Sequence, residues 1–384
     1  MDLKIFFDTV PENLLKPKVS NSFLEAISIF SETMPAWREA DIAIIGLTEN
    51  RGNNNNLGTS EAANAIREKL YNLKKGSEGY HIVDLGNLRN GTTLEDTYLR
   101  IKEVCGILME HQILPILIGG SHDLDVGQFL SYENSDKLLN VLNIDAFTDM
   151  EAYDHLQPAQ SHSQKIILHE PNYLFNYTNL AYQSYLTDAN MLNVLETLHF
   201  DSYRLGVVQE NISQLEPIVR DADMLSFDIS AVRMQEAPGN PNGQAFGLTA
   251  QEACQLCWYA GHSNKLSSAG FYEFTPELDF RGQTASVVAT MVWYLIEGYY
   301  ARPADNAFES DHYLRYIVPI SSDPAEIIFY KDKLTEKWWM EVPHPIVKSR
   351  YIRPSIIPCN YSDYQTACSG EIPDRWINIH TKLF

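Results

Sequence analysis

Short apolar runs alternate with amphipathic segments from residue 41 onward, and this alternation restricts the possible folds more than any other feature of the chain. Segments 59–73 and 93–111 carry apolar residues at helical spacing. Several apolar runs have the length and composition of buried strands: 41–47, 80–86, 113–120, 138–145, 203–209, 223–229 and 267–274. Repeated strand–helix–strand units predict an α/β fold, in which a mostly parallel, doubly wound sheet is covered by helices on both faces.

The two ends of the chain depart from this pattern. Residues 1–40 and 301–384 are rich in aromatic residues and proline, and their aromatic content argues against disorder. We therefore expect an α/β domain over 41–300, with the N-terminal extension packed on it. The C-terminal extension is expected to pack on this domain or on a neighbouring subunit. Inside the domain, the asparagine run at 53–56 is predicted to be a mobile loop.

The charge of the chain restricts its partners. With a formal net charge of −21, we expect neither nucleic acid nor an anionic membrane as a partner, because both repel an acidic surface. We find no apolar run of about 18 residues and no secretory signal at the start. The cysteines are few and unevenly spaced, which is not a disulfide framework. These features predict a cytoplasmic protein.

Two of the cysteines, Cys254 and Cys257, form a lone CxxC inside a predicted helix. Zinc would need two further ligands at suitable spacing. We therefore interpret the pair as small buried residues on one helix face.

Polar residues of the kind that bind metals follow the predicted strands. Ligands of open α/β sheets usually bind at the carboxyl ends of the strands, and one imidazole with carboxylates suits Mn²⁺ or a similar divalent ion. Each residue alone is a weak signal, because such residues often cap the next helix. The residues are His122, Asp145, Asp149, Asp228 and Glu273. If the strand before Asp145 continues, then Asp145, Phe147 and Asp149 point the same way.

The order of the motifs GG-x-H, D-A-x-x-D, S-F-D-x-x-A and E-x-x-P resembles the arginase (ureohydrolase) superfamily of arginases, agmatinases and formimidoylglutamases. The resemblance runs from about residue 41 to 300. It implies a three-layer α/β/α sandwich and two Mn²⁺ ions whose bridging hydroxide attacks a guanidinium or formimino carbon. It also implies a homo-oligomer, since trimers and hexamers are common in that superfamily.

The departures from the superfamily pattern concern the second metal site. The second site also needs a histidine and an aspartate at positions that Phe147 and Ser230 occupy here. A phenyl ring offers no lone pair, and a hydroxyl is a feeble ligand beside a carboxylate. We therefore expect one Mn²⁺ ion rather than two, with Phe147 filling the space of a lost ligand. The resemblance places the ligands of the first metal at His122, Asp145, Asp149 and Asp228.

Other residues near these motifs have two interpretations each. By resemblance His162 shuttles protons near the substrate, and the alternative is an exposed loop histidine. Glu273 pairs with the cationic head of the substrate, or it caps a helix. Asp123 and Asp125 are expected to cap the next helix rather than to contribute oxygens to the metal. Arg233 either neutralises the clustered carboxylates in place of a metal or points into solvent or a subunit contact.

Two functions follow from this pattern. The first is a metal-dependent hydrolase of a C–N bond in a small linear amidine or guanidino compound, of the formimidoylglutamase, agmatinase or arginase type. Its catalytic residues would be Asp149, His162 and Glu273. The alternative is a non-catalytic protein of the same fold that retains at most one metal and acts in binding or assembly.

Overall fold

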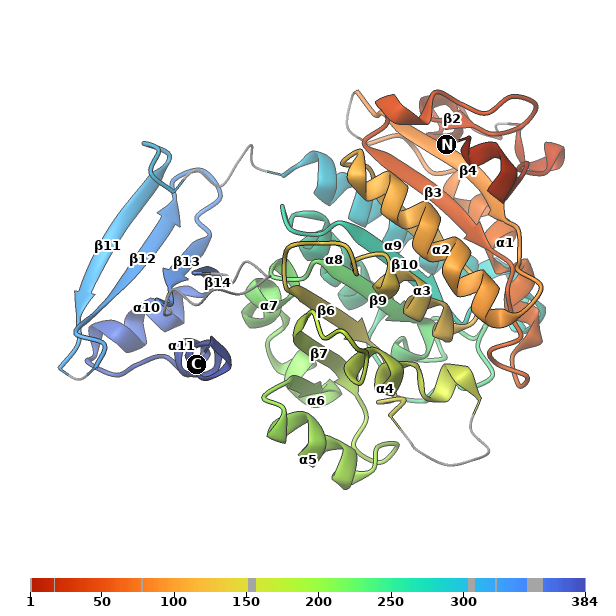
Figure 1. Ribbon diagram of the computed structural model, residues 1–384. Coiled ribbons are helices and arrows are strands. Elements are labelled where there is room, and N and C mark those ends of the chain that lie inside the picture. The colour runs from red at the N-terminus through yellow and green to blue at the C-terminus, as the bar shows by residue number, and fades with distance from the viewer. Residues whose placement is uncertain are drawn as a thin grey trace.

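The computed structural model describes residues 2–16, 18–76, 79–150, 157–302, 308–321, 323–343 and 355–383, and these form two β-sheets with their covering helices (Figure 1). The large sheet has the order β1-β4-β3-β5-β10-β9-β6-β7-β8, and β2 also pairs with β4. Its pairs are parallel, except that β1 runs antiparallel to β4. Its strands are β1 (Phe7–Asp8), β2 (Ser28–Ile29), β3 (Ile42–Leu47), β4 (Ile82–Leu88), β5 (Leu114–Ile118), β6 (Leu139–Ile144), β7 (Leu174–Tyr182), β8 (Asp201–Arg204), β9 (Met224–Asp228) and β10 (Ser268–Tyr272).

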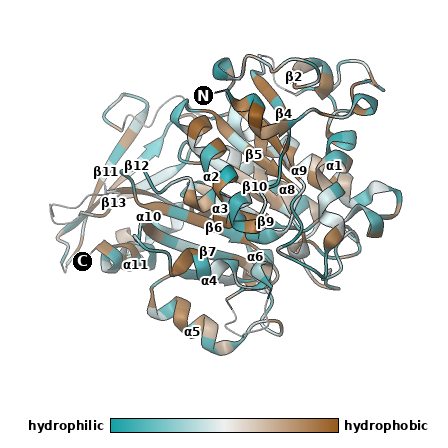
Figure 2. Cartoon of the chain, turned by 45° about the vertical axis from the view of Figure 1, so that its right-hand side comes forward, coloured by the Kyte–Doolittle hydropathy of each residue, from teal (hydrophilic) through white to brown (hydrophobic). Residues whose placement is uncertain are grey.

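Helices cover both faces of this sheet, so the predicted three-layer α/β/α sandwich is confirmed. One apolar cluster joins the sheet to α1, α8 and α9, and the other joins it to α2, α3 and α4. In Figure 2 the covering helices carry both hydrophobic and hydrophilic residues, as helices with one buried face do. The helices are α1 (Ala62–Leu70), α2 (Leu94–Glu110), α3 (Asp125–Leu130), α4 (His162–Ile167), α5 (Ala189–Thr197), α6 (Leu205–Glu210), α7 (Glu216–Arg220), α8 (Ala250–Gly261), α9 (Gln283–Tyr300), α10 (Tyr361–Cys368) and α11 (Asp374–Leu383).

Strand β3 shows how the sequence builds the two layers of core. Its residues are all buried, and alternate side chains enter opposite clusters: Ile44 packs under α1 and α9, whereas Ile45 packs under α2. This alternation is the two-residue period of an extended chain. Full burial of such a side chain contributes about 1.5–3 kcal/mol. A strand buried on both faces therefore needs the nearly continuous apolar run that the sequence supplies.

The N-terminal segment is part of the large sheet. Phe7 pairs with Leu88, and Ser28 pairs with Val83, so β1 and β2 both lie along β4. Phe7 is buried in the cluster under α2. The segment therefore extends the sheet at its edge.

The C-terminal segment forms an antiparallel sheet of its own in the order β11-β12-β13-β14, beside α7 in Figure 1. It has a separate apolar cluster that includes α10 and α11. Arg220 of α7 donates to the carbonyl of Trp338, and Lys337 pairs with Glu216. Parts of the predicted C-terminal extension, 303–307 and 344–354, lie outside the described residues. Its strands are β11 (Tyr313–Pro319), β12 (Glu326–Asp332), β13 (Trp338–Glu341) and β14 (Ile356–Cys359).

The strand predicted at 203–209 is wrong for most of its length. Strand β8 ends at Arg204, and Leu205–Glu210 is the helix α6. The β-branched pair at 207–208 favours a strand locally, but Val208 is buried against the sheet from a helix. The long strand β7 was not predicted, because Asn176, Thr178 and Asn179 interrupt its apolar run although all three are buried.

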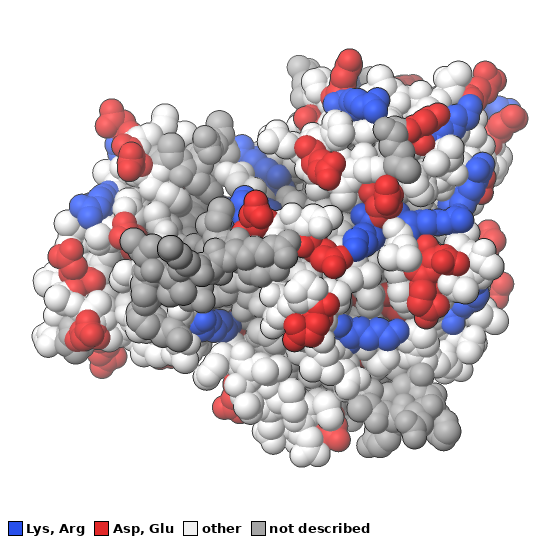
Figure 3. All heavy atoms as spheres, viewed as in Figure 1, with Lys and Arg blue, Asp and Glu red and all other residues white. Residues whose placement is uncertain are grey.

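The distribution of surface charge and the burial of two cysteines can be compared with the sequence. Acidic and basic side chains are interspersed over the face shown in Figure 3. Cys254 and Cys257 are both buried on α8, as predicted. Among the described residues, no helix is long and apolar enough to cross a membrane.

Candidate metal centre

The strands whose ends carry the predicted site residues are consecutive neighbours in the sheet, in the order β5-β10-β9-β6. His122 follows β5, Glu273 follows β10, Asp228 ends β9 and Asp145 follows β6. All these strands run parallel to their neighbours. Because the carboxyl ends of parallel strands meet at one edge, the residues converge although they are far apart in the sequence.

His122 reaches this edge through the turn at Gly119 and Gly120. Both glycines have positive φ, +89° and +78°, which residues with a Cβ rarely adopt. A Cβ on Gly119 would lie 2.9 Å from the carbonyl oxygen of Leu47. Glycine is therefore required here, and the turn delivers His122 to the first position of a short 3₁₀ helix.

Asp145 and Asp149 reach the site in a different way from the predicted one. Strand β6 ends at Ile144, so the side chains of Asp145, Phe147 and Asp149 do not alternate along a continued strand. A turn follows, and Asp149 has a φ of +45°, a strained value for a residue with a side chain. The left-handed residue turns the Asp149 carboxylate toward the histidines.

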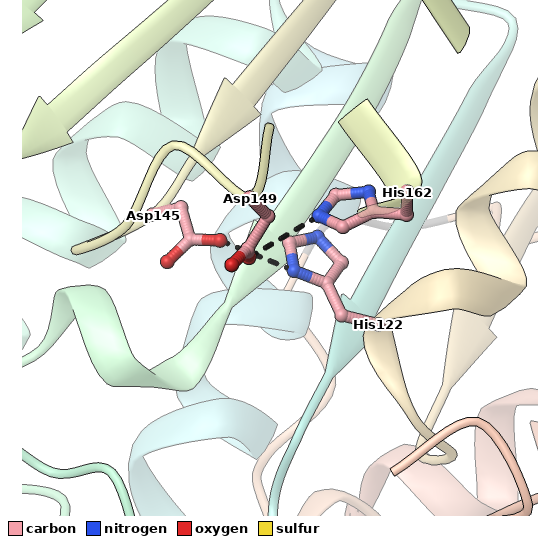
Figure 4. A group of neighbouring side chains, drawn as sticks. All are labelled: His122, Asp145, Asp149 and His162. Atoms are coloured by element: carbon pink, nitrogen blue, oxygen red, sulfur yellow. Dashed lines mark ion pairs between the residues drawn. The ribbon is translucent and has the colours of Figure 1, made fainter. Parts of the chain in front are cut away.

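Two histidines and two aspartates lie at the centre of the site (Figure 4). One ligand atom from each of His122, Asp145, Asp149 and His162 lies within 4.8 Å of the others. The Nδ1 atom of His122 is 3.2 Å from Asp145 Oδ2, and the Nε2 atom of His162 is 3.4 Å from Asp149 Oδ2. The two imidazole rings face each other with centroids 4.0 Å apart. The four side chains therefore surround one small volume.

Asp228 lies beside this group. Its Oδ2 atom is 3.3 Å from His122 Nδ1, and its Oδ1 atom accepts from the backbone N–H of Ser230 at 2.6 Å. The side chain of Asn240 also approaches Oδ1, at 3.5 Å. Asp228 is thus close enough to take part in a metal site, with one oxygen already in use.

Asp125 does not cap a helix, contrary to the prediction. Its Oδ2 atom is 2.8 Å from His162 Nδ1 and accepts from the Ser226 hydroxyl at 3.0 Å. Asp123 instead accepts from Tyr98 at 2.5 Å. Both aspartates are fully buried, and α3 has no side-chain cap. A buried carboxylate needs hydrogen-bond donors wherever they are, and here the nearest donors belong to the site.

Glu273 is buried and tied to the surrounding loops. Its Oε1 atom accepts from the backbone N–H of His122 at 2.9 Å, and Oε2 accepts from Asn53 at 2.9 Å and Asn56 at 2.6 Å. Asn53 and Asn56 are themselves buried, so the asparagine run predicted to be mobile is anchored to the site. Buried side-chain amides are the natural donors to a carboxylate, and this role was missed from the sequence.

His162 and Arg233 each follow one of their two predicted interpretations. His162 is fully buried in the site and is not an exposed loop histidine. Arg233 pairs with Glu236, and its side chain is substantially exposed. Arg233 is therefore not the cation that neutralises the carboxylates of the site.

A sequence model of the arginase family matches residues 40–297, which is more than half of the chain. The chain belongs to the arginase family. A formimidoylglutamase of Streptococcus gordonii is 23% identical over 294 residues, which cover 71% of this chain and 89% of the relative. A formimidoylglutamase of Streptococcus pyogenes is 25% identical over 297 residues, with 71% and 88% covered.

Solved structures of the family share the fold. A Trypanosoma cruzi formiminoglutamase with Mn²⁺ superposes with a TM-score of 0.64 at 20% identity, covering 71% of this chain and 97% of that one. A formimidoylglutamase from Bacillus subtilis gives a TM-score of 0.66 at 17% identity, covering 75% and 95%. The C-terminal sheet lies beyond the matched family region.

The Oδ1 atoms of Asp145 and Asp228 already accept hydrogen bonds within the chain. Asp145 Oδ1 accepts from the backbone N–H of Phe147 at 2.9 Å and from the Ser230 hydroxyl at 3.0 Å. Asp228 Oδ1 accepts from Ser230 as well. Only the bond to Asp145 comes from the Ser230 side chain, so an aspartate at this position would replace that donor with a carboxylate that repels Asp145.

Burial and mutual repulsion govern the pKa values of this arginase-family site. Burial and the neighbouring carboxylate of Asp149 raise the pKa of Asp145, and burial and Asp145 raise that of Asp228. Burial lowers the pKa of His162, but Asp125 and Asp149 together more than offset it and raise the value to about 9. Burial and Asp228 raise the pKa of Glu273 to about 7. The cluster therefore favours any cation that enters it.

The buried polar atoms fit a metal ion. His122 Nδ1, Asp145 Oδ2 and His162 Nε2 have no hydrogen-bond partner among the described residues. Buried polar atoms are nearly always partnered, so three partnerless atoms that face one volume call for a ligand. Imidazole and carboxylate together suit borderline divalent ions such as Mn²⁺.

Proposed function

We propose that this chain hydrolyses a C–N bond in a small linear amidine or guanidino compound, with one divalent metal ion held at the carboxyl edge of β5, β9 and β6. The observation that carries the proposal is the convergence of partnerless ligand atoms at that edge. Membership of the arginase family and the Mn²⁺ in a formiminoglutamase of the same fold support it.

The predicted ligands His122, Asp145, Asp149 and Asp228 would hold the ion. A bound divalent ion acidifies water and polarises the carbon that the water attacks. The chain itself keeps this volume nearly dry, since the side chains of His122 and Asp145 are at most 1% exposed. Charge interactions are stronger in such an environment than in water.

Glu273 would orient the cationic end of the substrate. The contact would be made by Oε2, in place of the hydrogen bonds that this atom accepts from Asn53 and Asn56. An amidinium could replace those amide donors with a charge-assisted hydrogen bond, which is about twice as strong as a neutral one. On the sequence-based hypothesis, His162 would give the departing amine its proton.

The test is turnover by protein loaded with Mn²⁺. Formimidoylglutamate, agmatine and arginine would be supplied separately, with release of formamide or urea as the measurement. We expect turnover of one substrate to be lost in Asp149→Asn and kept in Asp188→Asn, because Asp188 is an exposed helix cap away from the site. Equal turnover by wild type and Asp149→Asn would overturn the proposal.

The occupied oxygens of Asp145 and Asp228 favour a second candidate, a non-catalytic protein with one structural metal. On this view the ion neutralises the buried carboxylates and does no chemistry. Metal binding that raises the unfolding temperature, together with no turnover of any of these substrates, would identify it.

A further inference from the structure

The environment of His162 is that of a metal ligand. Its ring is fully buried, and Nδ1 lies 2.8 Å from Asp125 Oδ2. The opposite nitrogen, Nε2, faces Asp149 Oδ2 at 3.4 Å and has no hydrogen-bond partner among the described residues. A metal-bound histidine typically donates its other ring N–H to a carboxylate in this way.

Asp125 fixes the protonation of both histidines through one chain of hydrogen bonds. Ionised Asp125 can only accept, so Ser226 donates its hydroxyl to Oδ2. The hydroxyl oxygen must then accept from His122 Nε2, which lies 2.9 Å away. His162 Nδ1 donates to the same carboxylate. In the neutral rings, His122 Nδ1 and His162 Nε2 are therefore left without protons.

These two bare nitrogens face two carboxylate oxygens, at 3.2 Å for His122 and Asp145 and 3.4 Å for His162 and Asp149. Lone pairs so placed repel one another unless a cation lies between them. Protons on the rings can supply that charge when no ion is bound, although neither contact has hydrogen-bond geometry, and a divalent ion would displace them. A metal ion satisfies all four atoms at once.

We propose that His162 is a metal ligand and that Asp125 is its positioning residue. His122, His162, Asp145 and Asp149 then form the core of a single-ion centre with two imidazole and two carboxylate ligands. His162 thereby supplies the second imidazole that Phe147 cannot. The inference rests on the proposed metal dependence, and it replaces the proton-donor role of His162 with coordination.

This ligand set defines the ion by its chemistry. Two imidazoles with two carboxylates suit Mn²⁺, Fe²⁺ or Zn²⁺ better than Mg²⁺ or Ca²⁺, which prefer oxygen ligands alone. With Asp145 Oδ1 and Asp228 Oδ1 already accepting hydrogen bonds, the centre holds one ion.

The direct test counts the nitrogens bound to Mn²⁺. Titration calorimetry would give the affinity, and pulsed electron paramagnetic resonance of the Mn²⁺ complex would report the coupled ¹⁴N nuclei. We expect two histidine nitrogens in the wild type and one in His162→Gln. The affinity for Mn²⁺ should fall by more than about 100-fold, because about 10–100-fold is the usual loss when a residue that only supports a ligand is changed.

The matched control for that variant is His169→Gln. His169 lies just beyond α4 and packs against the rings of Phe129 and Tyr173, outside the centre. It should keep both nitrogen couplings and the affinity. Two couplings retained in His162→Gln would overturn the inference. If wild-type protein binds no Mn²⁺, Fe²⁺ or Zn²⁺, the proposed function fails instead.

The positioning role is tested by Asp125→Asn. The amide can present its NH₂ to His162 Nδ1, which moves the ring proton to Nε2 and blocks coordination. We expect one ¹⁴N coupling lost and an affinity about 10–100-fold lower. Asp123→Asn, which changes a buried aspartate bonded to Tyr98 and to neither histidine, should keep both couplings. An unchanged spectrum in Asp125→Asn would remove Asp125 from the proposal.

Circular dichroism in the presence of a chelator shows whether each variant is folded. His162→Ala serves as a second variant should His162→Gln not fold. It also lacks the side-chain amide that could bind the ion in place of the ring. Loss of one coupling in a folded protein supports the inference, and two retained couplings overturn it.

Discussion

Two groups of buried carboxylates in and beside the large sheet are neutralised differently. Asp84 on β4 pairs with Arg67 through two hydrogen bonds of 2.8 Å, and the Tyr71 hydroxyl and the Gly86 N–H also donate to it. Asp84 and Arg67 are both fully buried. In the strand-end cluster, the described ion pairs of Asp145 and Asp149 are with histidines, and three ligand atoms of that cluster have no hydrogen-bond partner among the described residues.

The comparison separates a carboxylate that is neutralised within the fold, Asp84, from carboxylates that can bind a ligand, Asp145 and Asp149. A carboxylate moved out of water needs a cation or several donors. Arg67 supplies the cation for Asp84 from within the chain. The strand-end cluster has no arginine or lysine among its described ion pairs. Its carboxylates are therefore balanced by protons on the histidines or by an ion that displaces those protons.

Removing Arg67, the cation that neutralises Asp84, should have the largest effect on the stability of the protein. Arg67→Met leaves Asp84 buried and unpaired, and we expect a loss of about 3–5 kcal/mol in the free energy of unfolding. Urea denaturation followed by circular dichroism measures it. Arg89→Met is the matched control, since Arg89 pairs with Asp8 on the surface; it should cost about 0–1 kcal/mol. Equal losses in the two variants would contradict the comparison.

Binding of a divalent cation to the strand-end cluster should stabilise the protein. Mn²⁺ at about 100 times its dissociation constant should add about 2.7 kcal/mol to the free energy of unfolding, because it binds the folded state alone. Thermal unfolding with and without a chelator measures the shift. Asp145→Asn should abolish it, whereas no shift in the wild type would mean that the cluster is neutralised in another way.

Restoring the second metal site sharpens the comparison within the cluster. Phe147→His with Ser230→Asp replaces a hydrogen-bond donor to Asp145 with a carboxylate, which then needs a cation of its own. We expect metal analysis to rise from one Mn²⁺ ion per chain to two. A double variant that still binds one ion would show that the site has no space for a second one.

The protein also buries an ionisable group in its neutral form, and this group is His262. Burial, with Lys337 nearby, lowers the pKa of His262 to about 4. The unfolded state therefore binds the extra proton between about pH 6.5 and pH 4, so stability falls as the pH falls through this window. Allowing for partial exposure, His262 should account for about 1–2 kcal/mol of that loss.

The variant His262→Gln tests the contribution of His262 to the pH dependence of stability. Urea midpoints measured at pH 7 and pH 4.5 should differ less in the variant than in the wild type. His111→Gln is the control, because His111 is exposed at the end of α2. An identical pH dependence in wild type and His262→Gln would show that other groups cause the loss.

Much of the fold could be predicted because local pattern and burial agree along most strands. The segments at 113–120 and 138–145 are continuous apolar runs, and they became β5 and β6. Strand β7 could not be predicted in this way, since its buried Asn176 and Asn179 donate to Asp201 and to the carbonyl of Phe147 in other segments, and Asn176 also donates to Thr178. The helix α6 likewise depends on tertiary packing, which overrides local β-propensity.

Motif order pointed to strand-end residues that the structure brings together, but it did not reveal their hydrogen-bond partners. His122, Asp145 and Asp149 follow recognisable strand ends, whereas the role of Asp125 depends on where α4 brings His162. Asn53 and Asn56 contact Glu273 across more than 200 residues of sequence. One signal was available: a lone carboxylate inside an apolar strand, such as Asp84, predicts a buried cationic partner.

The position of β10 between β5 and β9 has a consequence for the folding kinetics of the chain. The central strands of the sheet are contributed late in the sequence, and the hydrogen bond between His122 and Glu273 joins residues 151 positions apart. Loop closure over such distances slows folding. During synthesis, β5 and β6 exist before the strands that separate them, so the centre is assembled only after most of the domain has left the ribosome. Acquisition of the ion would therefore report the completion of folding.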